Sequence, residues 1–209
     1  MSFLTSIISS ALSFFYELTQ SWGLAIILLT IVIRLLMHPL TVSQSKSLLV
    51  MRKLQPKMKE LQEKYKDKPE EYQKRLVALY KEHKTNPLGG CLPMLLQMPI
   101  LFALFYVLRD ANYGEAGFLW IPSLSAPDPT YLLPLLTAAS TYIQMKLTTT
   151  DPAQQGMMYI MPLFIGFISL SFPSGLTLYW VISNITGYVQ QLLINKRLMA
   201  LDEEGSVAN

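Results

Sequence analysis

The residue with the clearest chemical potential is Arg34, a single cation inside the otherwise apolar segment 21–45. A guanidinium in the middle of a bilayer costs about 2.5 kcal/mol or more, so it has to face water or a partner. None of the five long apolar segments of the chain contains an Asp or Glu that could pair with it. We therefore expect a water-filled cavity around Arg34. Snorkelling of its side chain to the lipid head groups is the alternative.

Polar residues recur at helical spacing in three of the five apolar segments. Residues three and four apart share one face of a helix, so each of these segments has one polar side. The stripes are Thr30, Arg34, His38, Thr41 and Ser45; Thr137, Thr141, Gln144 and Thr148; and Thr177, Trp180, Asn184, Tyr188 and Gln191. In the other two segments Gln97, Ser169 and Ser171 are the main polar residues. The pattern predicts a polar interior cavity bordered by apolar walls.

The sequence shows no arrangement of residues that is typical of a site that makes or breaks covalent bonds. The histidines, His38 and His83, and the single cysteine, Cys91, do not form a metal-binding constellation. There are no paired carboxylates, no Ser–His arrangement and no phosphate-binding glycine loop. We expect a protein that is not an enzyme and that needs no cofactor and no metal.

Charge is scarce and uneven, which excludes an ordinary soluble domain. Charged residues make up 15% of the 209 residues, with a net charge of +3, against about 25% in soluble domains. The mean hydropathy is +0.32. The low charge predicts an all-α membrane protein with five transmembrane helices, at 21–45, 91–109, 131–147, 157–172 and 175–195.

Basic residues set the expected orientation, because they concentrate on the cytoplasmic side of a membrane. Of the 17 basic residues, 12 lie between Lys46 and Lys84. With this segment in the cytoplasm, Arg109 is the one basic residue left outside. We therefore predict a multi-pass membrane protein with its N-terminus outside and its C-terminus in the cytoplasm.

The remaining segments have patterns of their own. We expect residues 1–20 to form an amphipathic helix at the outer interface, with a sixth span as the alternative. Residues 46–86 predict a cytoplasmic antiparallel helical hairpin, because apolar residues alternate at spacings of four and three. Pro56 and Pro69 each suit a first helical turn. Residues 110–130 are an expected extracytoplasmic loop, 148–156 a cytoplasmic loop and 196–209 a cytoplasmic tail.

Several motifs resemble the YidC-type membrane protein insertases (the YidC/Oxa/Alb family). They are Ile33-Arg34-Leu35 with Pro39-Leu40-Thr41, Leu54–Met58, Asn86–Pro93 with Gln97-Met98-Pro99, and Phe172–Leu176 with Tyr179-Trp180 and Ser183-Asn184. The similarity covers about residues 20–197. It resembles a short form without a large extracytoplasmic domain or a lipobox cysteine. The acidic tail, with Asp202, Glu203 and Glu204, departs from the long basic tail that docks ribosomes.

This resemblance implies a hydrophilic groove that is open to the cytoplasm and to lipid and closed on the outer side. It implies that Arg34 is the groove arginine, beside Thr30, Gln144 and Trp180, and we add Asn184 and Gln97 to this groove. Met98 and Pro99 match the apolar surface along which substrates slide.

The resemblance implies insertion and folding of small one- or two-span proteins into the plasma membrane. Arg34 would attract their acidic segments. The expected partners are nascent membrane proteins and the lipid bilayer, with the general secretion channel and the ribosome as further candidates; we expect no specific nucleic-acid recognition. The alternatives are an anion channel or small-solute carrier with Arg34 as selectivity charge, and a passive chaperone beside the secretion channel.

Overall fold

The computed structural model describes residues 2–83, 92–111, 113, 116–149 and 155–207, and only the backbone of residues 2, 92–97, 155 and 202–207. Within these ranges there is no strand, only an isolated bridge between Phe118 and Ile121. The helices are α1 (Ser2–Thr19), α2 (Trp22–Leu36), α3 (His38–Lys64), α4 (Pro69–Glu82), α5 (Leu92–Asp110), α6 (Leu132–Thr148), α7 (Gln155–Ser169) and α8 (Ser174–Val207). The expected all-α fold is confirmed.

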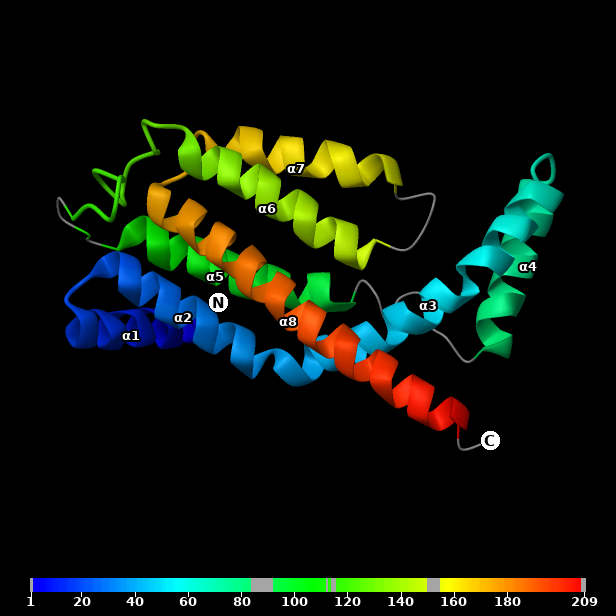
Figure 1. Ribbon diagram of the computed structural model, residues 1–209. Coiled ribbons are helices and arrows are strands. Elements are labelled where there is room, and N and C mark those ends of the chain that lie inside the picture. Colours follow the sequence, from blue (N-terminus) through cyan, green and yellow to red (C-terminus); the bar gives the residue numbers. More distant parts are fainter. Residues whose placement is uncertain (1, 84–91, 112, 114–115, 150–154, 208–209) are drawn as a thin grey trace.

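The other helices form a bundle, and the hairpin of α3 and α4 projects from one end of it (Figure 1). Helix α8 lies between the α6–α7 pair and α2, while α1 packs along α2 and α5. The tightest part of the core lies away from the hairpin. Its fully buried apolar side chains are Leu12, Ile26, Leu104, Leu108, Ile121, Leu124, Leu133 and Leu176.

Helices α2 and α3 meet at a bend of 59° at Met37. Pro39 lies in the first turn of α3. It has no N–H to donate, and its ring would clash with the carbonyl four residues earlier if α2 continued straight through it. The segment that the sequence predicts as one span, 21–45, therefore contains a break. Helix α3 then continues from His38 to Lys64 without an end at residue 45.

The hairpin has the predicted antiparallel pairing. Leu54 and Met58 of α3 are buried against Leu79 and Tyr80 of α4. Pro69 begins α4, with acidic residues in its first turn, as expected. The expectation for Pro56 is wrong, because this residue lies inside α3 and not in its first turn.

The loop between α5 and α6 closes the end of the bundle opposite the hairpin. The first N–H groups of a helix have no partner in their own helix. In α8 they are satisfied by this loop, because Ser174 donates to the carbonyl of Ala126 at 2.8 Å and Gly175 to that of Leu124 at 2.9 Å. The ring of Phe118 lies so close to Gly23 that any Cβ there would overlap it.

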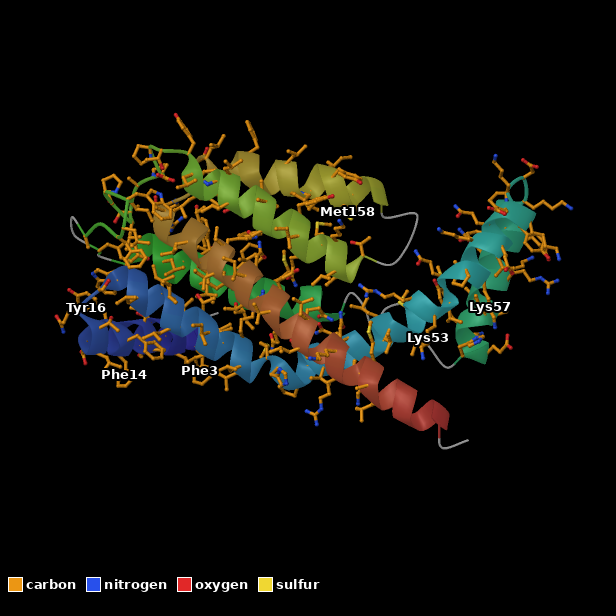
Figure 2. The ribbon with its side chains drawn as sticks, in the orientation of Figure 1. Phe3, Phe14, Tyr16, Lys53, Lys57 and Met158 are labelled. Carbon is orange, nitrogen blue, oxygen red and sulfur yellow. The ribbon has the colours of Figure 1, made fainter. Side chains whose placement is uncertain are left out.

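Helix α1 has apolar side chains on two sides. Ile8 and Leu12 are buried in the core, whereas Phe3 and Phe14 are 78% and 60% exposed and project away from the bundle (Figure 2). The apolar outer side is what an interfacial helix requires, and this location of α1 stays a prediction.

A membrane span needs about 20 predominantly apolar residues. No single helix of the described residues is long and apolar enough to cross a membrane, but the bent pair of α2 and α3 meets the requirement.

Candidate functional site

Arg34 is held against α8 by two hydrogen bonds. Its Nε and Nη2 atoms donate to the hydroxyl oxygen of Ser183 at 3.1 and 2.8 Å. One turn further along α8, a Cβ at Gly187 would lie 3.0 Å from the central carbon and both terminal nitrogens of the guanidinium. The guanidinium therefore lies against the bare backbone of α8, a contact that only glycine allows without displacement.

No acidic side chain among the described residues neutralises the charge of Arg34. Within the described residues, no Asp or Glu forms an ion pair with it. Arg34 also borders a cavity of about 360 Å³ between α2 and α8.

Two more polar contacts join the striped helices to α8. Asn184 donates to the hydroxyls of Ser140 and Thr141 on α6 at 3.1 and 2.9 Å. Gln191 donates to Ser45 of α3 at 2.8 Å. The polar stripes of segments 21–45 and 131–147 therefore both contact α8, which carries the third stripe.

Among the other predicted groove residues, those whose side chains are described do not bond to Arg34. Thr30 is 1% exposed and donates to the carbonyl of Ile26 in its own helix. Gln144 has a buried Oε1 without a hydrogen-bond partner, and Trp180 is half-buried. Gln97 belongs to α5, and its side chain lies outside the described residues.

On α5, Met98 and Pro99 are exposed, as residues that contact a sliding substrate must be. Most of α7 has the same character. Its exposed apolar side chains are Met157, Tyr159, Ile160, Leu163, Phe164 and Phe167.

A second cavity, of about 740 Å³, lies at the hairpin end between α3, α6 and α8. Arg52, Lys146, Tyr142 and Tyr188 line it, and Arg52 donates to the carbonyl of Leu147. It combines two cations with two aromatic rings, and none of the described residues in its lining is acidic.

Sequence reasoning missed Ser183 and Gly187 as partners of Arg34. Helical spacing offered a signal, since Trp180, Ser183 and Gly187 follow one another at intervals of three and four and share a face. Small residues on such a face allow a neighbouring helix to come close. The sequence could not show that Arg34 meets this face.

Comparison with known proteins assigns the chain to a family. The model of the 60Kd inner membrane protein family matches residues 14–202. The chain belongs to this family. It is 46% identical over 194 residues to the membrane protein insertase YidC of Geotalea daltonii, covering 91% of this chain and 37% of that protein. It is 44% identical over 208 residues to the membrane protein insertase YidC of Vibrio atlanticus, covering 97% of this chain and 38% of that protein.

A solved structure of the same family has the same fold. The crystal structure of an active YidC insertase with its first transmembrane domain resolved matches with a TM-score of 0.73 and 34% identity. The match covers 90% of this chain and 45% of that one. The resemblance to YidC-type insertases is thereby confirmed, and the chain spans less than two fifths of the length of the curated relatives named here.

Proposed function

We propose that this chain inserts small membrane proteins of one or two spans into the plasma membrane of a bacterium and helps them fold. Its membership of a family whose relatives are named insertases supports this reaction. The observation that carries the mechanism is the Arg34 guanidinium, which is held by Ser183 without an acidic partner among the described residues.

The first step is capture at the hairpin end. Arg52 and Lys146 line the cavity there and attract acidic segments of a nascent chain, while Tyr142 and Tyr188 offer apolar contact. The five-span arrangement, with the hairpin and C-terminus in the cytoplasm and the N-terminus outside, puts this cavity on the side where nascent chains arrive.

The second step is attraction to Arg34 in the proposed groove. Two opposite unit charges about 5 Å apart gain about 3 kcal/mol at an effective dielectric of about 20, but less than about 1 kcal/mol in bulk water. The unpaired Oε1 of Gln144 suits a hydrated lining. Thr30, Trp180, Asn184 and Gln97 complete this groove in our proposal.

The third step is release into lipid. The apolar span slides past Met98 and Pro99 on α5 and along the exposed apolar surface of α7. Burial of the span in the bilayer supplies the driving force, so we propose no nucleotide, metal or other cofactor. Nascent chains and lipid are the proposed partners, with the secretion channel and the ribosome as further ones.

Replacement of Arg34 tests the function. In an insertase-depleted strain, we expect Arg34→Ala to insert substrates with acidic outer segments several-fold less well than the parent. Arg34→Lys should retain much of the activity, because it keeps the charge but not the forked geometry. Arg109→Ala is the matched control, since Arg109 is exposed and bonds to Asp110. If Arg34→Ala inserted acidic substrates as well as the parent does, the charge of Arg34 would have no role in insertion.

A further inference from the structure

The α2–α3 bend crosses α8 (Figure 1). Along this seam lie two cavities, of about 360 and 350 Å³, which share His38 and Leu193 in their linings. The first lies between α2 and α8, and the second lies between α3 and the C-terminal part of α8. The shared residues make them two ends of one site.

The two ends differ in chemistry. Apart from Arg34, His38, Thr186 and Gln190, the first cavity has only aliphatic side chains in its lining, among them Leu35, Ile185 and Val189. The second cavity is bordered by two cations, Lys46 and Arg197. The site therefore joins an apolar trough to a basic end.

Among the residues whose side chains the structure describes, the basic end has no anion. Lys46 and Arg197 form no ion pair with an acidic residue in this part of the chain. Of the described residues that line the two cavities, none is Asp or Glu. His38 adds no negative charge, because an imidazole is either neutral or cationic; its Nδ1 atom lies 2.7 Å from the amide nitrogen of Gln190.

The apolar trough is open to the surroundings of the bundle. Leu35 and Leu193, on its two sides, are 64% and 65% exposed, and Ile185 and Val189 are each 50% exposed. In a member of an inner membrane protein family, exposed aliphatic side chains of this kind suit contact with acyl chains. A ligand that satisfies both ends must carry a negative head and an apolar tail.

We propose that this seam binds one anionic phospholipid. Its phosphate lies between Lys46 and Arg197, and an acyl chain lies over Leu193 along the trough between α2 and α8. Basic pockets between membrane helices are known to hold anionic head groups, and one basic side chain near an anionic lipid changes affinity about fivefold. The site does not depend on insertion activity or on which end of the bundle faces the cytoplasm.

Lipid binding to the purified full chain tests the head-group contact. Native mass spectrometry would compare phosphatidylglycerol with phosphatidylcholine of the same acyl chains. We expect a clear preference for phosphatidylglycerol, and a loss of about 25-fold in its affinity in Lys46→Gln/Arg197→Gln. The control, Lys57→Gln/Lys196→Gln, removes two exposed cations that lie outside the seam. Equal binding of both lipids by the parent chain, or an equal loss in the control, would overturn the proposal.

The position of the tail is tested on the unaltered chain, so this arm does not rely on the folding of a variant. Phosphatidylglycerol with a photoreactive acyl chain should label α8 around residues 185–193 and α2 near residue 35. Labelling confined to other helices would contradict the site. Displacement of the label by sn-glycerol 3-phosphate alone would also contradict the proposal, because the seam would then be a phosphate site. Displacement by an apolar peptide at equimolar concentration would contradict it too, because the seam would then be a protein-binding site.

Discussion

Gly187 sets the position of the Arg34 guanidinium. Replacing a glycine inside a helix by alanine ordinarily stabilises the helix by about 0.5–1 kcal/mol. At position 187 the new methyl group would stand 3.0 Å from three atoms of the guanidinium, closer than such atoms normally pack. The guanidinium has to move, and its bonds to Ser183 are lost or lengthened.

We therefore expect Gly187→Ala to lower insertion of acidic substrates about as much as Arg34→Lys does, with little change in the melting temperature. Gly156→Ala is the matched control, because a Cβ there meets nothing within 4 Å. Insertion of a model substrate into proteoliposomes and thermal unfolding measure the two effects. Parental activity in Gly187→Ala would show that the position of the guanidinium is unimportant.

Asp128 lies just before α6, bonds to the first turn of this helix and makes the stability of this end depend on pH. Its carboxylate, 4% exposed, accepts hydrogen bonds from the N–H and hydroxyl of Thr130 and from the N–H of Leu133. Burial alone would raise the pKa of Asp128, but these bonds outweigh it and lower the pKa below its usual value. The stabilisation is complete above the unfolded pKa of about 3.9 and is lost as the pH falls through the lower, folded value.

Asp128→Ala should therefore cost about 1–2 kcal/mol of unfolding free energy at pH 7 and progressively less at pH values below about 4. Asp110→Asn serves as control, because Asp110 is exposed and bonds only to its neighbour Arg109 within the described part of the chain. Denaturant unfolding at several pH values measures both. A pH-independent cost would assign the effect of Asp128 to packing.

Among single residues, the sequence identified Arg34 but not its partners. A lone cation in an apolar segment is visible in composition, because its cost does not depend on the neighbours. The roles of Ser183 and Gly187 depend on the rotation of α8 about its own axis. That rotation is decided by packing between helices distant in the chain, so spacing within one helix cannot reveal it.

Whole helices show the same difference between features that are local in the sequence and features that depend on packing. The hairpin seam was predictable, because a repeat of four and three residues specifies it locally. The break at Met37 was not, although Pro39 was visible, because Pro suits both a helix start and a kink. Pro56 shows the opposite outcome, since a proline that suits a helix start lies inside α3.

The hairpin is expected to loosen without loss of the bundle when its seam is weakened. Leu79 is 8% exposed and packs against the seam of α3, so Leu79→Ala should cost about 2–3 kcal/mol locally. Val77→Ala on the same helix is the control, with a side chain 51% exposed. Hydrogen exchange should rise within α4 and the second half of α3 and stay unchanged in α6 and α8. Faster exchange throughout the bundle would show that the hairpin is not an independent unit.

For the whole molecule, the distribution of basic residues predicts which end faces the cytoplasm. Single cysteines at Ser125 and Lys57 on a Cys91→Ser background distinguish the two ends. We expect an impermeant thiol reagent to label Ser125→Cys in intact spheroplasts and to label Lys57→Cys only after the membrane is opened. Lys57 lies on the projecting hairpin (Figure 2). The reverse pattern would invert the proposed orientation.

The convergence of three polar contacts on α8 limits how this protein can evolve. Ser183, Asn184 and Gln191 bond to three different helices within little more than two turns. One inserted residue rotates everything that follows by about 100°, so an insertion between Asn184 and Gln191 would break at least one of these contacts. A deletion between these two residues would break at least one contact for the same reason. Length variation in this family should therefore collect in the connecting segments and tails, while the middle of α8 keeps a fixed number of residues.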